Sequence, residues 1–464
     1  LDPNVEWEPS LGINFDDFIS PIDSVVNANP EQMAIWHDEA EAFANEAYGN
    51  LGGGEAYFEP GTARFDSLLN DITSKSSFLE GGSRIQDKSA LYHLHGEKIF
   101  DSEFARFTLG ANGRIYTPKS EGALFSDTGG VTIINREFGI YGGFEKRFKD
   151  DEWILKASMR LDKNENFDFL PSPALSLIWQ PKKEHSLRAT FTSAIRNPTL
   201  LNQYMYYNVG RAKLVGNISG YDSLVTIESL RDYYYTQNPD TLSYFNLDPI
   251  APEEVKSVEI GYRGVLFKNL YVDMNYYFNS YTNFIGFTTG ADIKILQSGF
   301  VVNDVYRIAT NSRETITTQG ATVGLNYYMG DHYAINGNYS WNVLNKESDD
   351  PIIPAYNTPE HKFNVGFRGR DLAINKFDGL GFNINYKWIE GFIFEGSPQF
   401  TGSVPTYGLL DAQINKRIDK ANLTIKIGAS NLLNNQVLQV YGGPFVGRMI
   451  YTSLSFDWKD KNNK

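Results

Sequence analysis

The chain has no cysteine, no run of eighteen apolar residues and no long block of basic residues among its 464 positions. The lack of cysteine excludes disulfides, thiol catalysis and cysteine-ligated metal sites. The lack of a long apolar run excludes a transmembrane helix, so any membrane crossing must use strands. With a net charge of -14 and no basic block, the chain offers nucleic acid nothing to bind.

What the chain does have is two-residue alternation of apolar and polar side chains. The clearest case follows Pro252-Glu253-Glu254, where the apolar positions are Val258, Ile260 and Tyr262. Some fifteen segments repeat this pattern, with short and long connections in turn, as in a membrane-spanning β-barrel. The 28 Tyr and 31 Phe suit aromatic girdles at two membrane interfaces. A mean hydropathy of -0.36 is compatible with a barrel, because only every second residue meets lipid. A large water-soluble all-β protein is the alternative.

Alternation and turn residues together predict fifteen strands, at 89–100, 103–117, 137–148, 153–163, 172–181, 185–196, 256–267, 270–287, 310–329, 332–344, 361–371, 380–392, 406–418, 422–433 and 447–458. We expect periplasmic turns at 149–151, 181–184, 268–269 and 330–331. We expect long external loops at 118–136, 197–255, 288–309, 345–360, 393–405 and 434–446. This phase places Trp153, Trp179 and Trp458 at the periplasmic interface and Trp341 and Trp388 near the outer one.

The first 88 residues lack the strand pattern, and we expect an extracellular loop region with short helices there. One helix is predicted from Asn29 to Gly49, where Asn can cap free amides and Gly can end a helix, and a second from Ala63 to Ile72. Residues 89–458 are assigned to the barrel strands and their external loops, and 459–464 to a polar C-terminal tail. Since the sequence opens on Leu1 rather than Met, we do not expect translation to start there.

Fifteen is an odd number, whereas single-chain bacterial outer-membrane barrels close with an even number of strands. The count therefore favours the later part of a larger barrel whose first strands lie upstream.

Four motifs, in order along the chain, resemble the TonB-dependent outer-membrane receptors of the Bacteroidetes type. They are Arg196-Asn197-Pro198 at the top of a rising strand, Asn208-Val-Gly-Arg-Ala212 in the loop beyond, Pro252-Glu253-Glu254 with Glu259-Ile260-Gly261-Tyr262, and Asn431-Leu432-Leu433-Asn434 before the last external loop. The resemblance runs from about Gly82 to Trp458 and covers the C-terminal part of the family's barrel.

The resemblance implies an all-β fold: a transmembrane antiparallel β-barrel, here about fifteen strands of 22, with a small, partly helical extracellular insertion. It implies the outer membrane of a Gram-negative bacterium, and import through a barrel closed by an N-terminal plug that the TonB-ExbB-ExbD complex acts on. The plug, the TonB-contacting segment and the first strands are absent from this sequence, so an upstream fragment of the same receptor is an expected partner. A surface lipoprotein is a further partner that the resemblance leaves open. The polar end, 459–464, departs from relatives that finish near an aromatic residue.

The loop 197–255 is the best candidate for ligand binding, because it is longer than a connection requires and rich in tyrosine. Tyrosine offers a flat apolar face and a hydrogen-bonding tip, which suits many ligands. The alternative is that these rings pack the loop against its neighbours. The candidate residues are Tyr204, Tyr206, Tyr207, Asn208, Arg211, Tyr233, Tyr234 and Tyr235.

Charged residues on the polar side of the predicted strands are expected to face the lumen, where water or a plug keeps them solvated. They are Arg188, Glu259, Arg263, Asp273, Arg368, Lys387 and Lys426. His93 and His95 share a strand face, and we expect polar filling of the lumen there rather than a metal site. Asp127 and Asp349-Asp350 lie in external loops without the spacing of a calcium loop. We expect no metal, no cofactor and no catalytic constellation.

The leading hypothesis is an active transporter that captures its ligand with external loops. The ligand is an iron chelate, a cobalamin-like cofactor, an oligosaccharide or a peptide, and the acidic balance disfavours a strongly anionic one. The alternatives are a passive porin of 14–16 strands and a receptor-like barrel that serves as a scaffold for surface proteins.

Overall fold

The structure is a computed structural model of the chain. It describes residues 35, 61–76, 82–208, 212–296, 299–345, 352, 356–374, 377–394 and 402–457. Apart from Ile35, the helix expected between Asn29 and Gly49 lies outside these residues. So do Arg211, Asp349-Asp350, Trp458 and the tail 459–464. The second expected helix is present as α4 (Ala63–Ser74), which Thr62 caps at its N-terminus.

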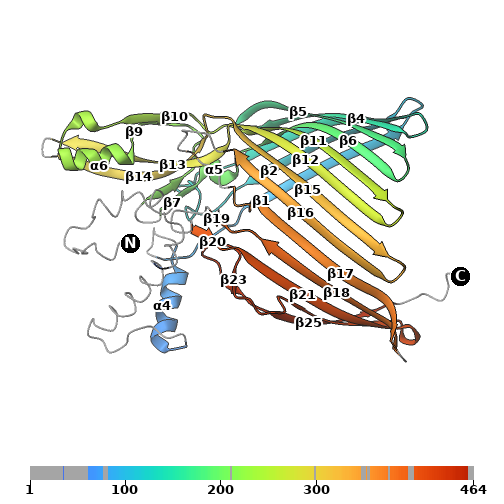
Figure 1. The fold of residues 1–464 in the computed structure, drawn as a ribbon. Coiled ribbons are helices and arrows are strands. Elements are labelled where there is room, and N and C mark those ends of the chain that lie inside the picture. Colours follow the sequence, from blue (N-terminus) through green and yellow to red (C-terminus); the bar gives the residue numbers. More distant parts are fainter. Residues whose placement is uncertain are drawn as a thin grey trace.

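One antiparallel sheet of fifteen strands dominates the fold and curves into an open wall (Figure 1). Each strand corresponds to one of the fifteen predicted from alternation, so the all-β expectation is confirmed. In order across the sheet the strands are β1 (Ala90–Asp101), β2 (Arg106–Thr117), β3 (Asn135–Phe148), β4 (Trp153–Asn164), β5 (Phe167–Lys182), β6 (His185–Arg196), β11 (Glu253–Leu266), β12 (Leu270–Thr282), β15 (Ile316–Met329), β16 (Tyr333–Asn345), β17 (His361–Ile374), β18 (Phe377–Ile389), β21 (Tyr407–Ile418), β22 (Leu423–Ser430) and β25 (Met449–Phe456).

The two faces of this sheet differ in chemistry, as the alternation predicts. The residue pairs in register place Ile260 of β11 beside Ala189 of β6 and Tyr276 of β12. Ile260 is 59% exposed, although it lies in the middle of a long strand. Exposed apolar side chains follow this face across the whole sheet, and we call it the apolar face. The opposite one, which carries most of the charged side chains of the strands, is the polar face.

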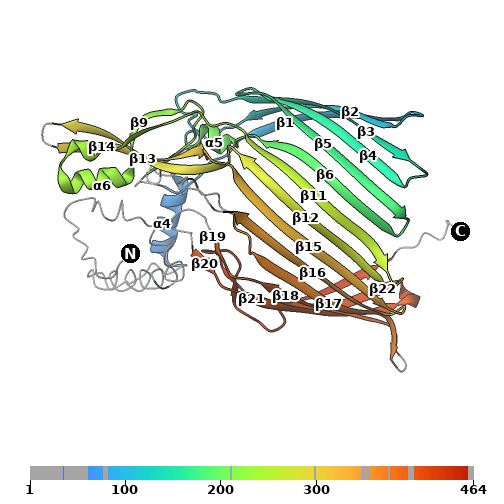
Figure 2. The same cartoon turned by 45° about the horizontal axis from the view of Figure 1, so that its top comes forward.

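The two ends of the wall differ as well. Short turns join the strands at one end, which we call the turn end, and long connections join them at the other, the loop end (Figure 2). Lys149, Asp150 and Lys268 of the turns take positive φ angles of 50°, 55° and 68°, which tight reversals require. Trp153 and Trp179 stack on the apolar face at the turn end, with ring centroids 5.7 Å apart.

The edges of the sheet are β1 and β25, which are not paired with each other in the described structure. Because every neighbour is antiparallel and the strand number is odd, β1 and β25 run in the same direction. A direct β1–β25 contact would therefore be parallel, unlike every other pair in the wall. Every residue of β1 is exposed, as befits an edge strand.

A second sheet of six strands projects beyond the loop end, where the sequence predicted only loops (Figure 1). Two connections of the wall supply it, 197–252 and 283–315. Its strands, in spatial order, are β10 (Tyr244–Leu247), β9 (Tyr221–Val225), β13 (Ile285–Leu296), β14 (Gly299–Asn311), β8 (Lys213–Val215) and β7 (Tyr206–Asn208). We call this unit the outer sheet. The pair β14–β8 is parallel, while the others are antiparallel.

Two predicted strand boundaries were wrong where the chain enters and leaves the outer sheet. The strand expected at 270–287 ends at Thr282, and the one expected at 310–329 begins at Ile316. Asn283 has a φ of 53° and redirects the chain from β12 into β13. The residues after it continue to alternate, so the sequence pattern alone concealed the break. The expected strand 422–433 ends at Ser430, because Asn431 has a φ of 50°.

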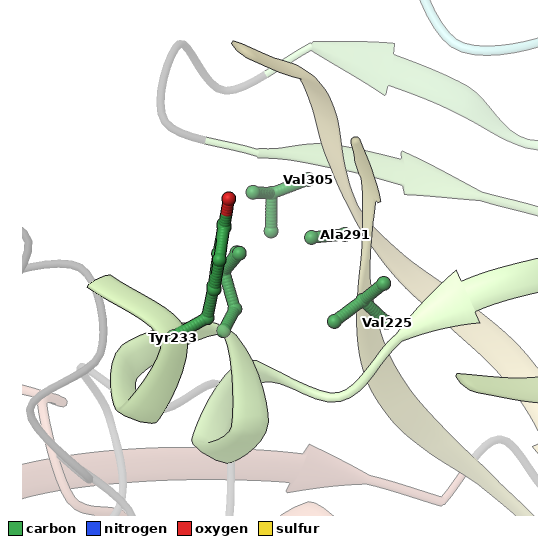
Figure 3. Packing of buried hydrophobic residues seen from close by; sticks show 5 residues of the cluster. Val225, Tyr233, Ala291 and Val305 are labelled. Carbon is green, nitrogen blue, oxygen red and sulfur yellow. The ribbon is translucent and has the colours of Figure 1, made fainter. Parts of the chain in front are cut away.

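A helix covers the outer sheet and gives it a small apolar core (Figure 3). Thr226 caps α6 (Ile227–Thr236) by accepting a hydrogen bond from the backbone N–H of Ser229. The helix directs Leu230 and Tyr233, which are 1% and 4% exposed, against strands β9, β13 and β14. The strand residues in this core are Val225, Ala291 and Val305.

The remaining elements are short. They are α5 (Leu200–Tyr204), two 3-10 turns, η2 (Pro239–Thr241) and η4 (Asp419–Ala421), and two small hairpins, β19 (Phe392–Phe394) with β20 (Gly402–Val404) and β23 (Val437–Leu438) with β24 (Phe445–Val446). No helix within the described ranges is both long and apolar enough to cross a bilayer.

We predict that Ile260→Arg destabilises the folded protein in lipid vesicles by about 2–4 kcal/mol, because it places a charge on the apolar face near mid-strand. Urea titration of the vesicle-inserted protein measures this difference. The matched control is Thr192→Arg on the polar face of neighbouring β6, which should cost less than about 1 kcal/mol. Equal losses in the two variants would contradict the assignment of the faces.

Candidate functional site

The corner where β6 leaves the wall is built by residues of the first and third motifs that carried the family resemblance, Arg196 and Glu253. Nη2 of Arg196 donates to Oε2 of Glu253 at 2.6 Å, and the Glu253 side chain is only 8% exposed. The same carboxylate oxygen accepts the backbone N–H of Ile285 at 3.1 Å. Glu253 therefore ties the top of β6 to the first residue of β13, and the outer sheet starts from a fixed point.

A second carboxylate, that of Glu137 on β3, holds the other side of this corner. Its Oε1 accepts Nδ2 of Asn197 and Nδ2 of Asn164, each at 2.9 Å. Its Oε2 accepts the hydroxyl of Tyr116 at 3.2 Å, and Nη1 of Arg114 lies 3.7 Å away. The 197–204 segment is thus held over the polar face of β3 and β4.

Buried amides complete this attachment. Asn135 and Gln203 are 1% and 3% exposed, and Nδ2 of Asn135 donates to Oε1 of Gln203 at 3.3 Å. Nδ2 of Asn166 donates to the same oxygen at 2.7 Å and to the hydroxyl of Tyr204 at 2.5 Å. Nε2 of Gln203 donates to the carbonyl of Pro198 at 2.7 Å. Buried amides that are satisfied in this way fix α5 in one position against the wall.

The connection between β2 and β3 forms a compact loop beside α5, and Asp127 organises it. The Asp127 carboxylate accepts hydrogen bonds from the backbone N–H groups of Ser120, Glu121 and Gly122 and from the Ser120 hydroxyl, at 2.6–2.9 Å. Burial opposes ionisation of Asp127, but these hydrogen bonds outweigh it and lower the pKa of Asp127 below its ordinary value. Both oxygens are engaged by donors, so this loop aspartate has a structural role rather than that of a cation ligand.

Between the polar face of β2–β4 and the α5 corner lies a polar cavity of about 600 Å³, which we call the mouth pocket. Its charged lining residues are Arg114, Glu137, Arg160, Asp162, Lys163 and Arg196. Nε and Nη2 of Arg160 donate to the two oxygens of Asp162, each at 2.6 Å. Nη2 of Arg160 also donates to Oδ1 of Asn112 at 2.7 Å. The guanidinium reaches across β3 at Gly139, where a Cβ would come within 2.4 Å of Nη2.

Four of the seven predicted lumen residues form one charge network on β6, β11 and β12. Nη2 of Arg188 lies 3.0 Å from Oε1 of Glu259, and its Nη1 lies 3.9 Å from Oδ1 of Asp273. Nη2 of Arg263 lies 2.6 Å from Oδ2 of the same aspartate. Arg188 crosses Gly261, where a Cβ would come within 2.7 Å of its Nε. Two cations and two carboxylates thus neutralise one another.

The other three predicted lumen residues also lie on the polar face but apart from this network. In register, Arg368 lies beside Asn383, Lys387 beside Asn364 and Lys426 beside Asn415. Within the described part of the chain, no carboxylate comes within ion-pair distance of Arg368, Lys387 or Lys426.

The predicted ligand-binding residues divide into groups with different surroundings. Tyr233 is buried in the core of the outer sheet, which favours the packing alternative for this ring. Tyr234 and Tyr235, on the same helix, are 45% and 59% exposed, with ring centroids 5.4 Å apart. Tyr204 belongs to the amide network beside the mouth pocket. Tyr206, Tyr207 and Asn208 form β7, and Arg211 lies outside the described residues.

The histidine pair lies on the polar face of β1, as expected. The rings of His93 and His95 are stacked, with centroids 6.4 Å apart. Nε2 of His95 lies 2.8 Å from the hydroxyl of Tyr141, which donates to Oε2 of Glu97 at 2.7 Å. Among the residues that the structure describes, no cluster of three or more His, Asp or Glu side chains is arranged to hold a metal ion.

The residues of the mouth pocket were missed from the sequence. Arg114, Glu137 and Arg160 occupy polar-face positions of β2, β3 and β4, so alternation could have assigned them to one face. Nothing local indicates that the 197–204 segment folds back over them. Only the assembled wall brings these parts of the chain together.

Comparison with protein families now defines the class. Residues 10–432 match the model of the family described as TonB dependent receptor-like, beta-barrel. The chain therefore belongs to this family of outer-membrane receptors and transporters, which are not enzymes. A search of the curated proteins finds no match.

Solved structures show the same fold at low identity. The siderophore receptor PirA from Acinetobacter baumannii has a TM-score of 0.55 and 16% identity, covering 82% of this chain and 57% of that chain. A variant of the ferric enterobactin receptor from Pseudomonas aeruginosa, in complex with enterobactin, has a TM-score of 0.57 and 18% identity, covering 79% and 54%. The copper transporter OprC has a TM-score of 0.55 and 13% identity, covering 79% and 56%. The chain thus spans little more than half the length of these structures.

We predict that Asp127→Asn loosens the β2–β3 loop at neutral pH, because an amide presents a donor where the carboxylate accepts. Amide hydrogen exchange of Gly122, Leu124 and Phe125 should accelerate about tenfold or more. The pKa of Asp127 is lower in the folded state than in the unfolded state. The stability that its carboxylate contributes to the native protein is therefore fully present at pH values above the ordinary Asp pKa, and it is lost as the pH falls through the lowered pKa of the folded state. The control is Asp222→Asn at an exposed position of β9, and unchanged exchange in the Asp127 variant would contradict the assigned role.

We predict a measurable coupling between Arg188 and Glu259. A double-mutant cycle with Arg188→Ala and Glu259→Ala should give about 0.5–1 kcal/mol, since the pair is hydrogen-bonded but partly exposed. Urea titration in vesicles provides the free energies of unfolding. The control cycle pairs Glu259→Ala with Arg368→Ala, four strands and therefore more than about 19 Å away, and should show no coupling. A coupling of similar size in both cycles would contradict a local network.

Proposed function

We propose that the protein is an active transporter of the outer membrane of a Gram-negative bacterium, which captures a ligand at the loop end and imports it through the barrel lumen. The observation that carries this proposal is the family match over residues 10–432. In this arrangement the apolar face meets lipid, the polar face lines the lumen, the loop end is extracellular and the turn end periplasmic.

Closure of the wall requires further strands. Backbone groups of β1 and β25 cannot stay unpaired in a bilayer, because each unpaired group costs several kcal/mol. An odd number of additional strands is needed to join these two edges with antiparallel pairs only. We propose that seven strands of the same receptor, encoded upstream, complete a 22-stranded barrel. The chain is then the C-terminal part of the barrel of a Bacteroidetes-type receptor.

The proposed division of the chain follows from this arrangement. Residues 1–88 form an extracellular loop region, 89–458 the transmembrane strands with their external loops, and 459–464 a polar tail. The charge network and the three separate cations of the polar face would meet the plug. The TonB-ExbB-ExbD complex would act through a plug region, which we place upstream together with the first strands.

Ligand capture is assigned to the outer sheet and the mouth pocket. The exposed rings of Tyr234, Tyr235 and Tyr206 offer stacking surfaces, and the pocket offers hydrogen-bond donors. The similar solved structures are a siderophore receptor, a ferric enterobactin receptor and a copper transporter, which supports a metal complex as the ligand class. A surface lipoprotein seated on the outer sheet is a further proposed partner.

The test compares uptake in three otherwise identical strains: the parent, one without the receptor gene and one without TonB. We expect the parent strain to deplete compounds from the medium that both other strains leave there, because import through a plugged barrel needs the TonB complex. Purified full-length receptor in a planar bilayer should stay closed to ions. Steady conductance of the purified receptor, with uptake that persists without TonB, would instead establish the passive porin.

A further inference from the structure

We propose that the mouth pocket binds a small polycarboxylate anion, and that Arg114 is its principal anchor. The inference deepens the proposed function by naming the charged groups of the captured ligand, its carboxylates. It rests on the proposed function only for the view that the pocket lies on the side from which the ligand arrives. It contradicts the expectation, drawn from the net charge of -14, that an anionic ligand is disfavoured.

The local charge of the pocket is opposite to that of the whole chain. Four cationic side chains line it, Arg114, Arg160, Lys163 and Arg196, against two carboxylates, Glu137 and Asp162. Even when Glu253, the partner of Arg196, is added to the carboxylates, one positive charge remains: four minus three. A pocket walled by protein strengthens the field of such an excess charge.

The two carboxylates are already satisfied by their neighbours. Asp162 is held by two hydrogen bonds from Arg160. Glu137 accepts three hydrogen bonds, two from amides and one from the hydroxyl of Tyr116. A cationic ligand would therefore compete with established contacts for either carboxylate. Arg160 and Arg196 are likewise engaged, with Asp162 and Glu253, so the cation at which an anionic ligand meets least competition is Arg114.

Arg114 is the cation with donors to spare. Its only carboxylate contact within the described residues is the 3.7 Å approach to Glu137, and 40% of its side chain is exposed. In register, Arg160 of β4 lies beside Tyr141 of β3, but its Nη2 reaches back to Oδ1 of Asn112, which is two residues from Arg114 on β2. Both guanidinium groups line the same pocket. Two guanidinium groups in one pocket suit a molecule with two or more carboxylates, each a planar partner for a guanidinium fork.

The size of the pocket agrees with this class. About 600 Å³ lies within the range of small-molecule sites. The amide network keeps α5 in place, so the pocket is formed before the ligand arrives, and little ordering cost is left for binding.

The experiment measures binding of propane-1,2,3-tricarboxylate to the purified full-length receptor in detergent by calorimetry at low salt. We expect saturable binding that weakens with added salt, and at least a tenfold loss of affinity in Arg114→Gln. Arg114→Lys, which keeps the charge but not the fork, should lie between the two. The matched control is Arg106→Gln, on the same face of the same strand at the turn end, which should bind like the native protein.

Several outcomes would overturn the inference. They are absence of binding in the folded native protein, equal affinity in Arg114→Gln and the native receptor, and equal affinity for inorganic phosphate, which would remove the carboxylate assignment. Thermal unfolding of each variant establishes that it is folded. Because this assay needs no TonB, TonB-dependent uptake with no tricarboxylate binding would refute only the ligand class. Binding without any uptake would refute only transport.

Discussion

The constraint on which the structure depends is that every backbone amide facing an apolar medium needs a partner. Inner strands of thirteen and fourteen residues, such as β12 and β11, satisfy it by pairing along nearly their full length with a neighbour on each side. Side-chain chemistry then follows from geometry, because consecutive residues must face opposite media. Ile260 and Glu259 are neighbours in sequence, yet one meets the apolar surroundings and the other belongs to a charge network.

Where strands leave the wall, pairing between backbone groups stops, and side chains supply the hydrogen-bond partners instead. Glu253 receives both the guanidinium of Arg196 and the backbone N–H that starts β13. Asn431 turns the chain after β22 at a positive φ, and its Nδ2 donates to the carbonyl of Asn435 at 2.6 Å. Arg196, Glu253 and Asn431, which belong to three of the motifs that resemble the receptor family, are therefore corner-forming residues.

The wall could be predicted from the sequence because each of its strands has a local signal. The signal is apolar–polar alternation that stops at turn residues such as Lys149-Asp150-Asp151. The outer sheet could not, because β8 pairs with β14, some ninety residues later in the chain, and three-residue strands leave no pattern. The polar-face residues Arg188 and Asp273 were predicted because their strand positions decide the face. Which tyrosines of the loop are buried and which are exposed was not predicted. The spacing of Leu230 and Tyr233, which fits one side of a helix, does indicate that the Tyr233 ring is buried. The mouth pocket depends on α5 folding back, which is determined by contacts distant in sequence, those of Asn135 with Gln203 and of Glu137 with Asn197.

The outer sheet is assembled from two connections that alternate in space: β10 and β9 come from the first, β13 and β14 from the second, and β8 and β7 from the first again. Each connection keeps its own hairpins if the other is replaced, but the pairs β9–β13 and β14–β8, which join the hairpins into one sheet, are lost. The two connections must therefore match one another for the outer sheet to form. If one connection is exchanged for that of a homologue, the chimera should form the wall but not the complete outer sheet. The two connections therefore act as one structural unit, although wall strands separate them in the chain.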